Sequence, residues 1–283
     1  MSATQVTGTL YVVATPIGNL EDITFRAVRI LRQADLIACE DTRQTRKLLE
    51  HYGIHKPLVS YHDHNERPRA EELIGELEAG RNVALVSDAG TPLIADPGFR
   101  LVAQARARGI PVSPIPGASA ILTALSASGL PTDSFLFCGF LPPKAGQRRK
   151  ALEASAGSDG TLVFFETPHR IVEALEDIAQ VLGDRPVVIA RELTKIHEEF
   201  LHGTATEVRA ALAQRPVVKG EIVLMIGKGA QAAQDERPLE EAVAELIARG
   251  TPRMEALKVV ARQRGISKRE VYKSAVPRKD GRA

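Results

Sequence analysis

The sequence predicts an α/β protein in which short buried strands alternate with amphipathic helices. Apolar runs rich in Val, Ile and Leu recur, and most are followed by a polar loop and a segment with apolar residues at helical spacing. Hydrophobic residues make up 44% of the 283 residues and aromatic residues only 4%, which indicates a globular protein with an aliphatic core. A chain of this length predicts about two domains.

Five apolar runs in the first part of the chain predict the strands of a parallel sheet. Helical segments separate them, as crossover helices do between parallel strands. The predicted strands are 8–14, 36–39, 58–61, 83–86 and 112–115, and the predicted helices are 23–33, 42–51, 68–79 and 98–108. We expect Asp22 to cap the first helix and Asp96 to cap the last, with Pro97 at its first position.

A second α/β domain of mixed character is predicted for residues 117–230, after a first domain that spans 1–116. Its predicted strands are 134–140, 161–165, 186–190, 199–202 and 221–226, and its predicted helices include 171–182 and 206–213. A polar linker leads to three helical patterns at 239–248, 253–264 and 268–274. A short turn at 265–266 joins the last two, so residues 238–283 predict a basic helix-turn-helix-like appendage.

The net charge of +2 conceals an asymmetry between the body of the chain and its end. Residues 249–283 contain eleven Lys or Arg and three Asp or Glu, so they carry +8 and the rest of the chain −6. A basic end indicates a polyanionic partner, with a solvated helical tail as the alternative. Cys39 and Cys138 lie in apolar runs, which indicates buried free thiols and a cytoplasmic protein. We expect no signal peptide, and no apolar run approaches the roughly 20 residues that span a bilayer.

Residues 87–98, Ser-Asp-Ala-Gly-Thr-Pro-Leu-Ile-Ala-Asp-Pro-Gly, are the most informative stretch. They follow a buried strand and contain two Gly, two Pro and two Asp, so they predict a loop at a strand end whose backbone a ligand can approach closely. The familiar nucleotide and nucleophile motifs are absent: no loop ends in Gly-Lys-Ser/Thr, no glycine-rich dinucleotide turn follows the first strand, and no Gly-x-Ser-x-Gly elbow occurs. Ser119, in Pro-Gly-Ala-Ser, is expected to cap a helix.

A polar cluster after the third predicted strand has two interpretations. His62, His64 and Glu66 alternate, so an extended chain would place them on one face, where they can hold a divalent ion. The alternative, which we favour, is a strand-end loop that contacts a substrate. We therefore expect no metal.

Seven motifs, in order along residues 8–275, resemble the bacterial ribosomal RNA methyltransferases of the tetrapyrrole-methylase-like superfamily. The motifs lie at 15–24, 39–43, 87–98, 116–119, 139–142, 165–170 and 191–195. One departure is Ala95, where the family pattern has Ser. The resemblance implies a two-domain methyltransferase with a small C-terminal helix-turn-helix. It also implies S-adenosylmethionine bound between the domains, a homodimer, and methylation of the ribose 2′-hydroxyl of a cytidine in the decoding region of 16S ribosomal RNA.

The resemblance and the strand-end positions together select candidate site residues. The cofactor is expected to contact Pro16, Asp88, Ala89, Gly90, Thr91, Ala118, Ser119, Phe140 and Leu141. An alcohol is a poor nucleophile, so a general base is expected, with Asp41, His64 and Glu40 as candidates. The RNA backbone is expected to contact Arg43, Lys144, Arg148, Arg170, Arg191 and Lys195. Two alternatives remain open: a methyltransferase acting on a tetrapyrrole, and a non-catalytic ribosome-assembly factor.

Overall fold

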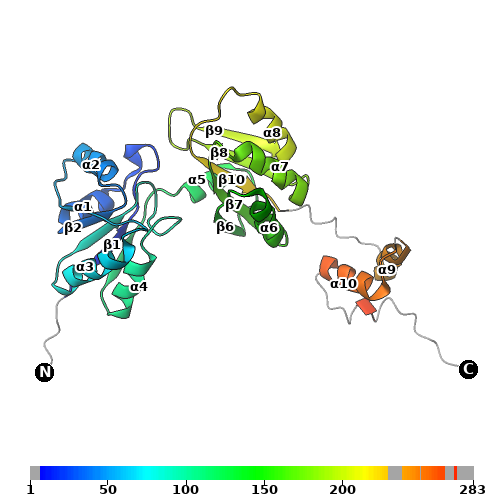
Figure 1. Ribbon diagram of the computed structural model, residues 1–283, viewed down its shortest axis with the longest axis horizontal. Helices are drawn as coiled ribbons and strands as arrows, with labels where there is room; N and C mark the ends of the chain where they lie inside the picture. The colour runs from blue at the N-terminus through cyan, green and yellow to red at the C-terminus, as the bar shows by residue number, and fades with distance from the viewer. Residues whose placement is uncertain (1–6, 229–237, 249, 265–270, 273–283) are drawn as a thin grey trace, which may run out of the picture. The chain divides into compact units, whose positions relative to one another are not determined.

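The structure is a computed structural model, and it describes residues 7–228, 238–248, 250–264 and 271–272. The chain divides into two compact units, Met1–Gly227 and Lys228–Ala283. The first unit contains two five-stranded sheets, and each sheet is built from a continuous part of the chain (Figure 1). We describe each unit by itself.

The first sheet is entirely parallel, as the alternation of strands and helices predicted. Its strand order is β3-β2-β4-β1-β5. The strands are β1 (Leu10–Val13), β2 (Leu36–Cys39), β3 (Leu58–Ser60), β4 (Val83–Val86) and β5 (Val112–Ile115). Because the strands are parallel, their carboxyl ends and the loops that follow them share one edge of the sheet.

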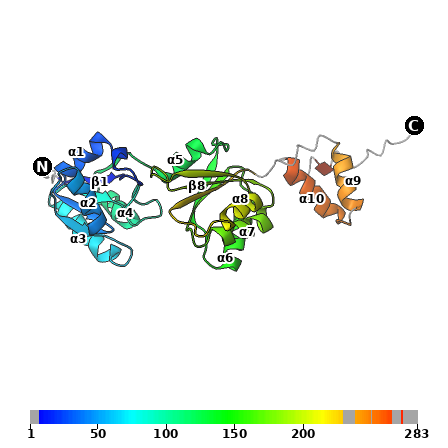
Figure 2. The same cartoon turned by 90° about the horizontal axis from the view of Figure 1, so that it is seen from above.

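Helices cover both faces of this sheet (Figures 1 and 2). They are α1 (Phe25–Gln33), α2 (Thr42–His51), α3 (Glu66–Glu78) and α4 (Phe99–Ala107), with a short 3-10 helix, η1 (Leu20–Asp22), before α1. Side chains of α1 and α2 pack in one buried cluster with alternate strand residues, and those of α3 and α4 pack in another on the opposite face. The alternation follows from the two-residue repeat of a strand.

Two predicted helix caps are wrong. Thr24, not Asp22, caps α1, since its side chain accepts a hydrogen bond from the Ala27 backbone N–H. Helix α4 begins at Phe99 and has no side-chain cap from Asp96 or from its N-cap residue, Gly98. A carboxylate from α3 fills that role instead: Glu66 Oε1 accepts the N–H of Gly98 at 3.3 Å and that of Arg100 at 3.4 Å. Asp96 is thereby left without a capping function.

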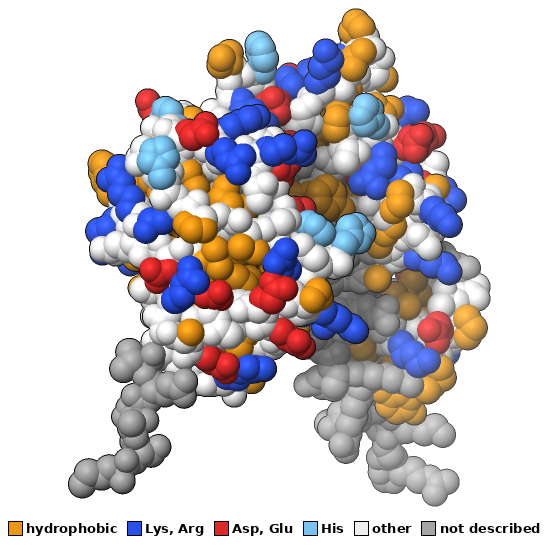
Figure 3. Space-filling model, turned by 60° about the vertical axis from the view of Figure 1, so that its left-hand side comes forward, with side chains coloured by type: hydrophobic (Ala, Val, Ile, Leu, Met, Phe, Trp, Pro, Cys, Tyr) orange, Lys and Arg blue, Asp and Glu red, His pale blue; other side chains and the backbone are white. Residues whose placement is uncertain are grey.

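The outward faces of α1 and α2 are rich in cations. Exposed Lys and Arg side chains on these helices are Arg26, Arg29, Arg32, Arg43, Arg46 and Lys47. Figure 3 brings the left-hand side of Figure 1 forward, and Lys and Arg side chains gather on the upper part of that face. In contrast, the inward faces of the two helices are apolar.

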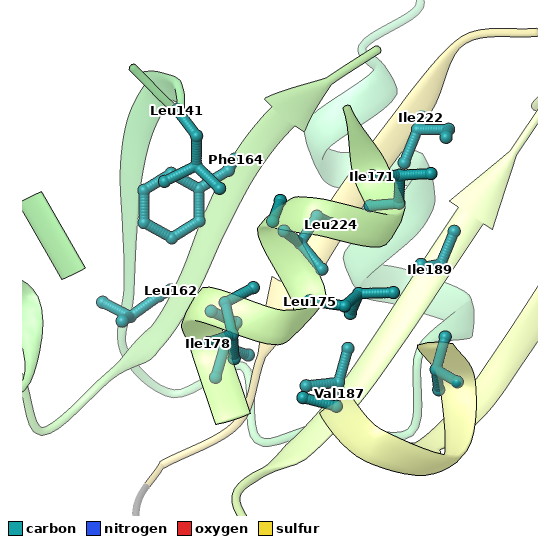
Figure 4. Close-up of a cluster of buried hydrophobic side chains, with 14 of the residues drawn as sticks. Leu141, Leu162, Phe164, Ile171, Leu175, Ile178, Val187, Ile189, Ile222 and Leu224 are labelled. Carbon is teal, nitrogen blue, oxygen red and sulfur yellow. The ribbon is translucent and has the colours of Figure 1, made fainter. Parts of the chain in front are cut away.

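The second sheet combines parallel and antiparallel strands, with strand order β6-β7-β10-β8-β9. Strand β6 (Phe135–Phe140) is parallel to β7 (Thr161–Glu166), and the pairs with β8 (Pro186–Arg191), β9 (Glu199–Thr204) and β10 (Ile222–Ile226) are antiparallel. Helices α6 (Ala145–Ser155), α7 (Ile171–Leu182) and α8 (Ala205–Ala213) pack on one face over a large aliphatic core (Figure 4). Helix α5 (Ala120–Ala127) packs on the other face.

The second unit contains α9 (Leu239–Ala248) and α10 (Arg253–Arg264), which match two of the three predicted helices. Their side chains form a small cluster that includes Val243, Leu257 and Val271. The predicted turn at 265–266, and all of the third helix except residues 271–272, lie outside the described residues, as does most of the predicted linker. In the described part of the chain no helix has the length and apolar character needed to cross a membrane.

Candidate active site

A cavity of about 320 Å³ lies at the carboxyl edge of the first sheet and is closed on its other side by the second sheet. This volume falls at the lower end of the range for small-molecule sites. The loops that follow β1 and β4 contribute Ile17, Ala89, Gly90, Thr91, Ile94, Ala95 and Asp96 to its lining. Its lining from the rest of the unit includes Ser119, Ala120, Ile121, Phe140, Phe165, Glu166, Ala190, Leu193, Glu221 and Val223.

The loop after β4 is held in a strained conformation beside the cavity. Gly90 pairs with Thr15 in an isolated bridge, with N–H to O distances of 2.9 and 3.1 Å, and has φ of 82°. Two residues with side chains, Leu93 and Ala95, also have positive φ, of 73° and 64°. Each such residue costs on the order of 1 kcal/mol or more, and strain of this kind concentrates at functional sites.

A second strained loop, which follows β8 of the second sheet, contacts the loop after β1. Glu192 and Thr194, after β8, have φ of 52° and 64°. A Cβ on Gly18 would lie 2.6 Å from Lys195 Cγ and 2.8 Å from Thr194 Oγ1, so the loop after β1 requires glycine to approach this one. Leu193 and Ile17 belong to one buried cluster. The loops after β1, β4 and β8 therefore surround the cavity, and the loop after β1 contacts both of the others.

Asp96, in the loop after β4, is one of the carboxylate residues that line the cavity. Burial, together with the nearby charges of Glu40 and Asp88, raises the pKa of Asp96 to about 6. Burial and the charge of Asp88 also raise the pKa of Glu40. Carboxylates crowded in a half-buried place resist ionisation, which makes each a better proton acceptor once it is ionised.

Glu166, at the end of β7, is a second carboxylate residue among those that line the cavity. Its side chain is fully buried, and Oε1 accepts the Thr167 N–H at 2.7 Å and pairs with Arg170 at 2.6 Å. Within the described residues, its other oxygen, Oε2, has no hydrogen-bond partner. A buried carboxylate oxygen without a donor is costly, so this atom is suited to accept a hydrogen bond from a ligand.

Five of the predicted cofactor residues line the cavity: Ala89, Gly90, Thr91, Ser119 and Phe140. Ser119 also caps α5 as expected, by accepting the Leu122 N–H at 3.5 Å. Ala118 adjoins the cavity through its carbonyl oxygen, which accepts from Thr91 Oγ1 at 3.5 Å. Pro16 and Asp88 neighbour lining residues in the chain. Leu141 is different: it is buried in the core of the second sheet with Phe164 and does not line the cavity (Figure 4).

Most of the Lys and Arg side chains predicted to contact RNA form ion pairs within the protein, so they are less free to bind phosphate than the sequence indicated. Arg148 is 2% exposed and its Nε donates to Asp177 at 2.6 Å, so the expectation that it binds phosphate is wrong. Arg170, Arg191 and Lys195 are held by ion pairs with Glu166, Glu199 and, for Lys195, both Glu192 and Glu221. Lys144 occupies the N-cap position of α6. Arg43 is exposed and pairs with Asp41 at 2.8 Å.

The predicted general bases lie outside the cavity lining. Asp41 caps α2, and its hydrogen bonds and ion pair with Arg43 hold its pKa at about 2, which makes it a weak proton acceptor. The rings of His64 and His62 pack edge to edge with centroids 5.9 Å apart. The extended chain that a metal site at His62, His64 and Glu66 would need does not form, since residues 63–65 form a turn and Glu66 begins α3 and pairs with Arg100. Sequence reasoning missed Asp96, whose position in the 87–98 loop was the available signal.

Comparison with known proteins agrees with this architecture. The family model "Tetrapyrrole (Corrin/Porphyrin) Methylases" matches residues 9–209. Proteins called ribosomal RNA small subunit methyltransferase I are 52% identical in Halalkalibacterium halodurans (272 residues, 94% of this chain and 93% of the relative) and 47% identical in Escherichia coli O157:H7 (279 residues, 97% of each).

Solved structures share the fold at low sequence identity. The cobalt precorrin-4 methyltransferase CbiF superposes with a TM-score of 0.59 at 16% identity, over 77% of this chain and 94% of that one. Uroporphyrin-III C-methyltransferase from Thermus thermophilus, complexed with S-adenosylhomocysteine, gives 0.54 at 21% identity, over 79% and 99%. Two sheets with a cavity at the strand ends thus define a protein of the tetrapyrrole-methylase fold.

The chain belongs to the tetrapyrrole methylase family and, within it, to the ribosomal RNA small subunit methyltransferase I group. It is therefore a methyltransferase built on a fold without the glycine-rich dinucleotide turn, in agreement with the absence of that turn from the sequence.

Proposed function

We propose that the protein transfers a methyl group from S-adenosylmethionine to the ribose 2′-hydroxyl of a cytidine in the decoding region of 16S ribosomal RNA. The observation that carries the proposal is the cavity itself, with its strained loop, its apolar walls and two buried or half-buried carboxylates. The relatives' shared name supports the choice of small-subunit ribosomal RNA as substrate.

The residues in the cavity fit this methyl donor. Ile17, Phe140 and Phe165 provide apolar walls for a planar base, and Glu166 Oε2 offers a buried acceptor for a hydroxyl or amino group. The carboxylates suit a cationic ligand that carries no phosphate, and the lining contains no Lys or Arg. When bound, S-adenosylmethionine supplies a methyl group activated by its sulfonium charge.

Asp96 is our candidate for the general base. It lines the cavity, and its raised pKa of about 6 leaves it mostly ionised at neutral pH yet more basic than an ordinary aspartate. It would take the proton of the attacking hydroxyl as the new oxygen–carbon bond forms and the methyl–sulfur bond breaks, with S-adenosylhomocysteine as the leaving group. Asp41, with a pKa of about 2, is less suited to this role.

The function is tested by incubating the protein and labelled S-adenosylmethionine with small ribosomal subunits that lack the modification, with naked 16S ribosomal RNA, or with a tetrapyrrole. Nuclease digestion and mass spectrometry should find the label in 2′-O-methylcytidine. Label on a nucleobase or on the tetrapyrrole would refute the proposal. Failure to bind S-adenosylmethionine would favour an assembly factor.

We also propose a homodimer that forms through the free edge of the second sheet. Strand β6 lies at that edge, and its Phe135 and Leu136 are 42% and 46% exposed. An exposed apolar edge strand favours association.

Light scattering should give twice the chain mass of 30.6 kDa, and Leu136→Lys should shift the protein to monomer. The control Val217→Lys, at an exposed apolar residue after α8, should stay dimeric. A wild-type monomer would refute this assembly.

The basic segment 249–283 is proposed as a further contact for RNA, because its charge of +8 favours a polyanion. We also propose domains at 1–116 and 117–230, because each range contains one of the two five-stranded sheets, and a basic appendage at 238–283. We propose that the protein acts in the cytoplasm, where small ribosomal subunits are found.

A further inference from the structure

We propose that the outer faces of α1 and α2 form a docking surface for the RNA substrate, where cations contact phosphates and the ring of Phe25 stacks on an unpaired base. This surface, called the α1–α2 surface below, comprises Phe25, Arg26, Arg29, Arg43, Arg46 and Lys47. The inference rests on the proposed RNA methylation and adds the place where RNA binds.

The charge of the α1–α2 surface is strongly positive and largely uncompensated. The two helices contain six Lys or Arg and a single carboxylate, Glu50. Among the residues that the structure describes, Arg26, Arg29 and Arg46 make no ion pair, whereas Arg43 pairs with Asp41. Unpaired cations on one face attract the phosphate backbone and release its counterions on binding.

Phe25 gives this surface a feature that charge alone does not explain. Its side chain is 98% exposed, although it occupies the first position of α1, where Thr24 caps the helix and fixes the backbone. An aromatic ring that is exposed to water on a helix terminus, next to Arg26 and Arg29, can stack on an unpaired base as aromatic side chains do in RNA-binding proteins.

The topology places this surface beside the cavity. Helices α1 and α2 both begin at the carboxyl edge of the first sheet, because each follows a parallel strand. Arg43 lies two residues from Asp41, whose N–H donates to Asp88 Oδ1 at 3.0 Å, and Asp88 belongs to the loop that lines the cavity. An RNA held by the N-terminal ends of α1 and α2 therefore has ribose groups within reach of the cavity mouth.

Two variants separate the two parts of the proposal. The doubly reversed variant Arg26→Glu/Arg29→Glu should weaken binding of small-subunit ribosomal RNA at least about 10-fold and lower the slope of log affinity against log salt by about 2. Phe25→Ala should weaken binding about 5- to 100-fold without changing that slope. Both variants should keep the wild-type affinity for S-adenosylmethionine, which also reports that they are folded.

The matched control is Arg106→Glu/Arg108→Glu, which makes the same change of charge at the C-terminal end of α4, away from the carboxyl edge. It should bind RNA as the wild type does. If the α1 variants behave like this control while the wild type methylates RNA, the docking surface is wrong and the proposed function stands. If vesicles of acidic lipid bind the α1–α2 surface and RNA does not, the surface is likewise refuted. If the wild type fails to methylate RNA, the proposed function fails by itself.

Discussion

Replacing Asp96 with Asn should slow methyl transfer about 10²- to 10⁴-fold, measured at a concentration of S-adenosylmethionine that saturates the variant. The amide has almost the same shape as the carboxylate but cannot take a proton from the attacking hydroxyl. In single-turnover experiments the rate of transfer should fall by this factor. A decrease of less than about 3-fold would contradict the assignment of Asp96 as the base.

The pH dependence provides a second measure of the same residue. Because the pKa of Asp96 is about 6, the wild-type rate should rise tenfold per pH unit below pH 6 and level off above it. The control is Asp41→Asn, which removes a carboxylate whose pKa is about 2. The rate of this variant should still fall below pH 6, as the wild-type rate does. If the rate of the Asp41 variant no longer depends on pH near 6 while that of the Asp96 variant still does, Asp41 and not Asp96 is the general base.

Asp96 should also lower the stability of the folded protein at neutral pH. Its pKa is raised in the fold, so the unfolded chain releases the proton first and stability falls as pH rises from about 4 to about 6. Asp96→Asn should remove this fall and be more stable at pH 8 by about 1 kcal/mol, after allowance for partial exposure. A catalytic group that costs stability is the expected trade-off at an active site.

Filling the cavity should have a comparably large effect. Ala120 lines the cavity at the first position of α5, so Ala120→Trp keeps a helical backbone and places an indole where the ligand is proposed to bind. We expect the affinity for S-adenosylmethionine to fall at least about 100-fold, which corresponds to about 2.7 kcal/mol. Calorimetry measures this change directly.

The matched control for that variant is Ser126→Trp, at an exposed position on the same helix. It adds the same side chain outside the cavity and should bind the donor as the wild type does. Equal affinity of the Ala120 and Ser126 variants would show that the donor binds elsewhere.

The strands and the parallel order of the first sheet could be predicted because local apolar patterns determine them. The errors arose where a contact distant in sequence decides the outcome. Asp96 was taken for a helix cap, but Glu66, 32 residues before Gly98, supplies that function. Arg148 was taken for an RNA contact, but Asp177, 29 residues away, holds it in the core. No local pattern encodes either partner.

The cavity was predictable only in part for the same reason. Gly90 and Ser119 stood out because loops at strand ends supply ligand sites. The left-handed conformations of Leu93 and Ala95 left no signal, since these residue types seldom adopt them. The free oxygen of Glu166 depends on how Thr167 and Arg170 use its other oxygen, which only the folded chain reveals.

The most direct measurement is a crystal structure of the protein with S-adenosylhomocysteine. Our account predicts the ligand in the cavity, in contact with Gly90 and Ser119, with one of its donors on Glu166 Oε2 and with Asp96 beside the sulfur end. A ligand bound outside this cavity, or a Glu166 Oε2 still without a partner in the complex, would contradict it.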